Sequence, residues 1–123
     1  MERLFFILGS LSAFLAVAAG AFASHGLKTR LSSDLLNTFE IGVRYHFYHA
    51  LALLVVAWAC ARWPNNSAII SAGWLFVIGT VIFSGSLYAL AFTGQRGLGA
   101  ITPIGGLAFL GGWLCLAWGA WRG

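Results

Sequence analysis

The side chains with the greatest capacity for chemistry lie between positions 25 and 49. They are three imidazoles, one carboxylate and one guanidinium: His25, Glu40, Arg44, His46 and His49. Neutral imidazole is a good ligand for zinc and copper, and a set of three protein ligands leaves one coordination position open. Histidine also titrates near neutral pH, which suits a proton carrier. The first question is therefore whether these side chains form one site.

Helical spacing relates several of these residues. Glu40 precedes Arg44 by four positions, which is the favourable order for an ion pair along a helix. Tyr45 and His49 share that spacing, and His46 lies three positions before His49. No carboxylate or thiolate joins the imidazoles at a recognisable ligand spacing, and the chain has no nucleophile motif or phosphate-binding loop. The sequence therefore predicts no metal site, no cofactor and no enzymatic activity.

The composition indicates which kind of structural element carries these residues. Only 8% of the chain is charged and 60% is apolar, whereas a soluble domain is about 25% charged. Each uncharged stretch is long enough for one membrane crossing and too short for two, because a crossing takes about 20 helical residues. These stretches are residues 4–26, 45–61, 63–95 and 97–121. The sequence predicts one all-α domain, 1–123, that is an antiparallel four-helix transmembrane bundle.

We expect the four helices at about residues 4–24, 45–62, 67–93 and 103–121. Residues 33–44 place apolar side chains at spacings of three and four, which predicts an amphipathic segment at the interface or against the bundle. Ser33 is its expected N-cap. A continuous helix from Ser33 through the second crossing would exceed the hydrocarbon layer, so it must protrude, tilt or bend near Gly42. Thr102 and Pro103 are expected as the N-cap and first residue of the last helix.

Small residues recur at helical spacing in three of the predicted crossings. Along a helix, such residues allow another backbone to approach closely. The positions expected to pack helices together are Ser12, Ala16 and Gly20 in the first crossing, Ser84, Gly85 and Ser86 in the third, and Gly111, Cys115 and Gly119 in the fourth.

The net charge of +4 comes from basic residues scattered singly along the chain. This distribution suits anionic lipid headgroups and does not resemble a nucleic-acid footprint. The expected partners are membrane lipids, a second copy of the chain or a larger membrane complex, and no nucleic acid. Three basic residues near the helix ends on one side against four on the other leave the orientation open.

Four segments of the chain resemble one family of small membrane proteins. They are GAFASHGL at 20–27, FEIGVRYHFYHALALL at 39–54, SGSLYALAFTG at 84–94 and LGAITPIGGLAFLGGWLCLAW at 98–118. They are similar to the bacterial family of unknown function that also includes the animal transmembrane protein 256. The resemblance implies a four-helix integral membrane protein, located in bacteria in the inner membrane, with no established biochemical activity.

The resemblance also changes which of the candidate residues are expected to form a site. Relatives more often carry glutamine at position 46, so His46 is interpreted as incidental. The remaining cluster is interpreted as a polar clasp between helices or a binding surface, and comprises His25, Glu40, Arg44, Tyr45 and His49. We expect a non-enzymatic structural, assembly or accessory membrane component. Two alternatives stay open: a small transporter or channel that uses this cluster, and a metal- or cofactor-binding membrane protein.

Overall fold

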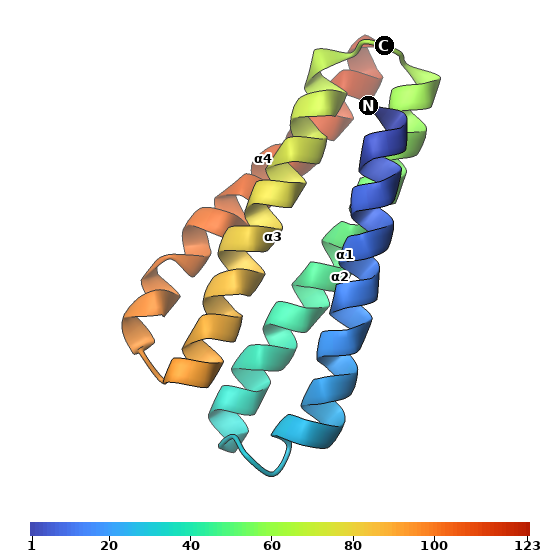
Figure 1. Ribbon diagram of the computed structural model, residues 1–123. Helices are drawn as coiled ribbons and strands as arrows, with labels where there is room; N and C mark the ends of the chain where they lie inside the picture. The colour runs from blue at the N-terminus through green and yellow to red at the C-terminus, as the bar shows by residue number, and fades with distance from the viewer.

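The computed structural model describes all 123 residues and is helical almost throughout. Four long helices are joined by short turns, two of which wind into single turns of π-helix (η1) and 3-10 helix (η2). In chain order the elements are α1 (Glu2–Phe22), η1 (Ala23–Leu27), α2 (Ser33–Arg62), α3 (Ser67–Thr93), η2 (Arg96–Ala100) and α4 (Thr102–Arg122). The long helices run antiparallel, with both chain termini at one end (Figure 1). Each is long and apolar enough to cross a membrane, which confirms the predicted fold.

The segment 33–44 is not a separate element but the first part of α2, which continues through Gly42 without a break. Gly42 is buried, and a Cβ there would lie 2.9 Å from the Tyr88 ring, so α3 supports the helix at this point. The apolar side of the segment packs inward, since Phe39 is 3% exposed. With 30 residues, α2 is about 45 Å long, so it extends beyond the hydrocarbon layer or crosses it at a tilt.

Helix ends follow ordinary capping rules, with two differences from the sequence expectation. The N-cap of α2 is Ser32, one residue earlier than expected, because its extended backbone lets Oγ accept from the Leu35 N–H at 3.2 Å. Thr102 is the first residue of α4 rather than its cap, because η2 leads into α4 through Ile101 in a helical conformation. The Asn66 side chain caps α3 by accepting from two backbone N–H groups.

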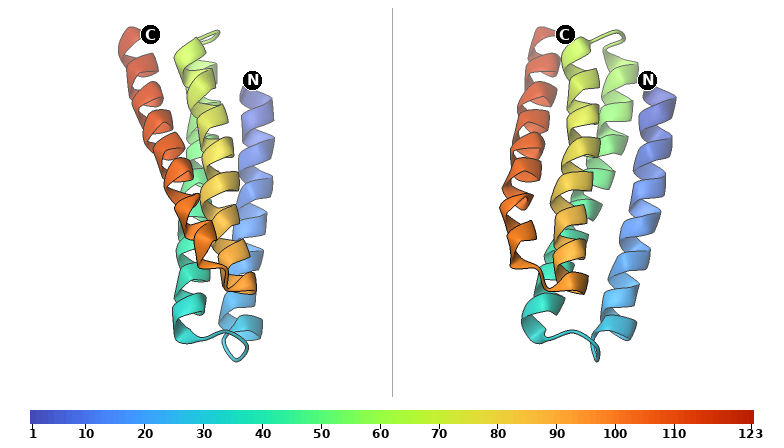
Figure 2. Two further views of the ribbon diagram at one scale, coloured as in Figure 1. Left: turned by 90° about the vertical axis from the view of Figure 1, so that its left-hand side faces the viewer. Right: turned by 60° about the vertical axis from the view of Figure 1, so that its left-hand side comes forward.

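The helices form a row in which chain neighbours are also neighbours in space: α1 packs on α2, α2 on α3, and α3 on α4. In Figure 2, α1 and α4 lie at opposite ends of this row. The main core nevertheless draws at least one large side chain from each helix, including Phe5, Val56, Phe76 and Phe109. Of the four, α2, one of the two inner helices of the row, is the most buried.

Glycines allow the closest approach between helices. A Cβ at Gly112 of α4 would lie 2.6 Å from the Phe76 ring of α3, and one at Gly79 of α3 would lie 2.5 Å from Phe109. Large aromatic rings therefore occupy the places that side chains at these glycines would fill. Gly79 was not among the positions that the sequence indicated for close packing.

The positions that were singled out lie in different surroundings. Ala16 is buried, a Cβ at Gly20 would lie 3.3 Å from Val43, Cys115 packs on the core, and Gly119 lies against Ile69 of α3. Gly111 is less close, since a Cβ there would lie 3.6 Å from Leu75. Gly85 packs against nothing, because a Cβ would meet no atom within 4 Å.

Candidate functional site

His46 joins three helices in the interior of the bundle. Its Nδ1 lies 2.9 Å from the Tyr88 hydroxyl of α3, and its Nε2 lies 3.0 Å from the Ser12 hydroxyl of α1. The side chain is 8% exposed. Both ring nitrogens are therefore engaged in hydrogen bonds. In a neutral imidazole one of them donates its N–H and the other accepts. We call Ser12, His46 and Tyr88 the α1–α3 clasp.

His49, one turn further along α2, faces α4 instead. Its ring stacks on Phe109 with centroids 3.5 Å apart and planes 7° from parallel. Nδ1 donates to the Tyr45 carbonyl at 2.8 Å, and Nε2 accepts from the Trp113 indole N–H at 3.1 Å. A carbonyl only accepts and an indole only donates, so the geometry fixes the neutral tautomer with its proton on Nδ1.

The serines of α3 are also engaged. Ser84 donates to the Gly42 carbonyl of α2 at 2.7 Å. Ser86 donates to the Phe83 carbonyl at 2.9 Å, and its hydroxyl lies 2.6 Å from that of Thr102 in α4. These contacts tie α3 to both of its neighbours.

The cluster expected from the sequence does not converge on one site. His25 and Arg44 line a shallow groove between α1 and α2, while Tyr45 and His49 belong to the side of α2 that meets α4. Glu40 is half-buried and Arg44 exposed, and no ion pair within 4.0 Å joins them. The favourable spacing of these two residues therefore does not produce a salt bridge.

Beside the α1–α3 clasp lies a hollow of about 390 Å³ between α1, α2 and α3. The three clasp residues line it together with Thr80, Gly85 and leucine and valine side chains. Thr80 Oγ1 is the one buried side-chain oxygen or nitrogen that has no hydrogen-bond partner. None of the residues that line this hollow carries a formal charge.

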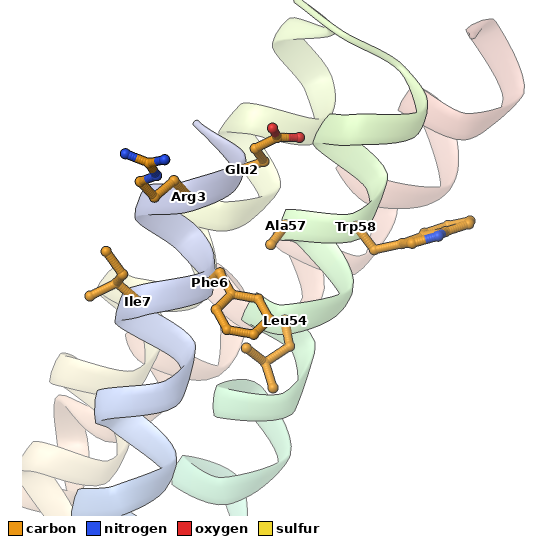
Figure 3. A pocket seen from close by; sticks show the side chains of 7 residues that line it. All are labelled: Glu2, Arg3, Phe6, Ile7, Leu54, Ala57 and Trp58. Carbon is orange, nitrogen blue, oxygen red and sulfur yellow. The ribbon is translucent and has the colours of Figure 1, made fainter.

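A second hollow lies between α1 and α2 at the end that holds the termini. Figure 3 shows its lining, in which the Glu2 and Arg3 side chains diverge and Phe6 and Leu54 lie between the helices. The Trp58 ring points away from α1 (Figure 3). Because its charged groups do not point at a common position, this hollow has no feature that would orient a ligand.

No three side chains of histidine, cysteine, aspartate or glutamate come close enough together to hold a metal ion. His46 and His49 belong to one helix, yet each is directed to a different neighbour by its hydrogen bonds. His25 is exposed at the end of α1. The three imidazoles that suggested a metal site therefore lie in three separate environments.

Sequence reasoning missed the α1–α3 clasp because it set His46 aside. Glutamine, which the resemblance implies for that position in relatives, offers one donor group and one acceptor, so it is able to make the same bridge between Ser12 and Tyr88. Two further signals were available: each of these three residues is polar, and each falls within an apolar stretch long enough to cross a membrane. In such a setting a polar side chain needs a partner on another helix.

The fold and these contacts define a class of protein: a small polytopic α-helical membrane protein with an apolar core and hydrogen bonds between its helices. The comparisons with known sequences agree with this class. The chain belongs to the family described as "Protein of unknown function (DUF423)", whose profile matches residues 19–106. The resemblance seen in the sequence is thereby confirmed.

Relatives from several bacteria match almost the whole chain. It is 46% identical over 114 residues to the UPF0382 membrane protein YwdK of Bacillus subtilis, covering 93% of each chain. It is 47% identical over 114 residues to the UPF0382 membrane protein SH2409 of Staphylococcus haemolyticus, covering 93% of this chain and 92% of the relative. For a UPF0382 membrane protein of Haemophilus influenzae the identity is 42% over 122 residues, covering 99% and 97%. No solved structure matches significantly.

Proposed function

We propose that this protein is a non-enzymatic accessory component of the bacterial inner membrane, which acts through contacts inside the bilayer with further copies of itself or with a larger membrane complex. The observation that carries the proposal is the use of the two interior imidazoles. His46 and His49 each engage both ring nitrogens in hydrogen bonds, and between them they tie α2 to all three other helices. The groups best suited to catalysis are thus committed to holding the bundle together.

The outer surface supports the same proposal. The outward side chains of α1 and α4 are large and apolar, with Phe14 71% exposed and Leu114 73% exposed. Such surfaces meet lipid tails or other transmembrane helices, where van der Waals packing drives association. The inner-membrane location is supported by helical spans and by bacterial relatives that are named membrane proteins.

A transporter is less well supported than an accessory component. A water-filled route for a solute would have to pass from His25 and His49 along Ser84 and Ser86. His49 lies between Phe109 and the Trp113 indole, and both serines donate to backbone carbonyls. Three of the four side chains along that route, His49, Ser84 and Ser86, are therefore held in hydrogen bonds within the bundle.

Photo-crosslinking in native membranes tests the accessory role. A photoreactive phenylalanine analogue would replace Phe14 on α1 or Leu114 on α4, with Ser33, the exposed first residue of α2, as the control position. We expect a stoichiometric adduct with a second copy or with one defined membrane protein from α1 or α4, and none from Ser33. Adducts with lipid only, together with a monomeric mass after release from native membranes, would refute the proposal.

The location is tested separately by density-gradient fractionation of Gram-negative membranes that contain the tagged protein. We expect the protein to migrate with an inner-membrane marker. Migration with the outer-membrane fraction would show that the proposed location is wrong, without bearing on the crosslinking result.

A further inference from the structure

We propose that the hollow between α1, α2 and α3 binds an uncharged, membrane-soluble carbonyl compound of the prenyl quinone class. The proposal does not rest on the accessory role above. Its basis is the hydrogen-bond inventory of the four polar residues in the wall, Ser12, His46, Thr80 and Tyr88, together with the depth of the hollow and its lack of charge.

The α1–α3 clasp always has one donor too many. Ser12 and Tyr88 each contribute one O–H, and neutral His46 contributes one N–H, but the clasp contains only two hydrogen bonds. If Nδ1 carries the proton, it donates to Tyr88, Ser12 donates to Nε2, and the Tyr88 O–H is left over. If Nε2 carries the proton, the Ser12 O–H is left over. In either tautomer a free O–H donor remains at one end of the clasp, on a residue that lines the hollow.

Thr80 adds a second unused donor. Its Oγ1 has no partner, although a threonine in a helix commonly bonds a carbonyl of the preceding turn. Thr93 of the same helix does so, with its hydroxyl donating to the Ala89 carbonyl at 2.7 Å. Helical threonine populates two χ1 rotamers, so a rotation is able to turn the Thr80 hydroxyl toward an occupant of the hollow. The site thus has donors in excess, and the group that satisfies donors is an acceptor such as a carbonyl oxygen.

Depth selects the kind of carbonyl compound. Thr80 lies 13 residues from either end of α3, about 20 Å from each end, which is near the mid-plane of the bilayer. The ester carbonyls of glycerolipids lie under their headgroups at the interface, far from this depth. A molecule that brings a carbonyl to the mid-plane must be soluble in the hydrocarbon itself, as prenyl quinones are.

Charge and size agree with that class. An anionic headgroup would need a cation, and no lysine or arginine lines the hollow. Its volume of about 390 Å³ falls within the range of small-molecule sites, about 300–1,000 Å³. The apolar wall suits a ring and the start of a prenyl tail, with the rest of the tail extending into the lipid.

Two substitutions test the site with little risk to folding. Thr80→Val removes a hydroxyl that has no partner to lose. Gly85→Leu fills the hollow from a position where a Cβ meets nothing within 4 Å. The controls are Thr38→Val, which removes a hydroxyl outside the hollow that donates to the Asp34 carbonyl, and Gly106→Leu on α4, where a Cβ would lie 3.9 Å from Phe83.

The experiment uses the full chain in phosphatidylcholine nanodiscs, titrated with a 1,4-quinone bearing a two-isoprene tail. The fraction of protein that retains quinone is measured by native mass spectrometry, and folding of each variant is checked by circular dichroism. We expect saturable binding of one quinone per chain. Thr80→Val should weaken it about fivefold, the effect of losing one hydrogen bond, Gly85→Leu should abolish it, and both controls should bind as the unaltered protein does.

The same titration with geranylbenzene, which has a ring and tail but no carbonyl, tests the chemistry. We expect no saturable binding of this compound. The proposal is overturned if geranylbenzene binds as tightly as the quinone, if only phosphatidylcholine is retained, or if Thr80→Val and Gly85→Leu both bind the quinone normally. If Gly85→Leu does not fold, the comparison of Thr80→Val with Thr38→Val decides.

Discussion

Replacing His46 tests whether the α1–α3 clasp stabilises the bundle. The most informative pair of variants is His46→Leu and His46→Gln, because both side chains are of comparable size and only glutamine offers a donor and an acceptor. His46→Leu removes both hydrogen bonds, at 2.9 and 3.0 Å, and leaves the hydroxyls of Ser12 and Tyr88 without their partner. His46→Gln keeps a group able to bridge the same two hydroxyls.

The expected magnitude follows from the number of bonds. Interhelical hydrogen bonds inside membrane proteins average about 0.6 kcal/mol and reach about 1.7 kcal/mol each. Two of them are therefore worth about 1–3 kcal/mol, part of which the leucine restores through van der Waals packing in a buried position. We expect His46→Leu to lower the free energy of unfolding by about 1–2 kcal/mol relative to His46→Gln.

The assay is reversible unfolding in mixed micelles of increasing SDS content, followed by circular dichroism. His25→Leu and His25→Gln provide the control pair, because His25 is exposed and its side chain makes no hydrogen bond; these two variants should be equally stable. Equal stability of His46→Leu and His46→Gln would refute the clasp. A further check is Ser12→Ala in the His46→Leu background, where the two changes should not be additive because they remove the same bond.

Four other substitutions have expected outcomes in the same assay. Trp113→Phe removes the donor to His49 Nε2 and should destabilise by about 1 kcal/mol, and no change would show that this bond contributes nothing. Glu40→Gln should change stability by less than about 0.5 kcal/mol, since no ion pair or hydrogen bond holds its half-buried side chain and substitutions that break no such contact have small effects; a larger loss would restore the ion-pair interpretation of its spacing. Gly112→Ala should cost about 1–3 kcal/mol by overpacking against Phe76, whereas Gly85→Ala, with open space around it, should be neutral or stabilising; the reverse order would contradict the described packing.

Much of the fold could be predicted because the membrane imposes it. Hydrocarbon cannot satisfy backbone polar groups, so each long apolar stretch must be a helix, and charges at 62, 96 and 122 mark where stretches end. The predicted start of α2 was wrong by one residue. Its N-cap is Ser32 rather than Ser33, because either of two neighbouring serines is able to cap a helix. The unbroken course of α2 through Gly42 depended on support from Tyr88, a contact between distant parts of the chain that spacing alone does not reveal.

The site could not be predicted because it depends on how each helix is rotated about its axis. In a soluble protein the polar face of a helix marks its outside, but in these helices nearly all positions are apolar and the periodicity is weak. Residues spaced along one helix, such as Glu40 and Arg44, suggested a local cluster. The observed contacts join residues 34 and 42 positions apart, from His46 to Ser12 and to Tyr88. Only the register between helices brings these together.

The position of α2 follows from the same physics. It is the least apolar of the four spans and also the most buried, the reverse of the order expected in water. A polar side chain in hydrocarbon gains most where neighbouring helices surround it with partners, and α2 contacts α1 and α3 along its length and reaches α4 through His49. Burial of α2 thus gives its two interior histidines partners, while its buried apolar residues pack against the neighbouring helices. Among related chains, the span with the most polar residues should therefore be the central helix, and substitutions that exchange its polar residues should be matched by changes in the helix that each residue contacts.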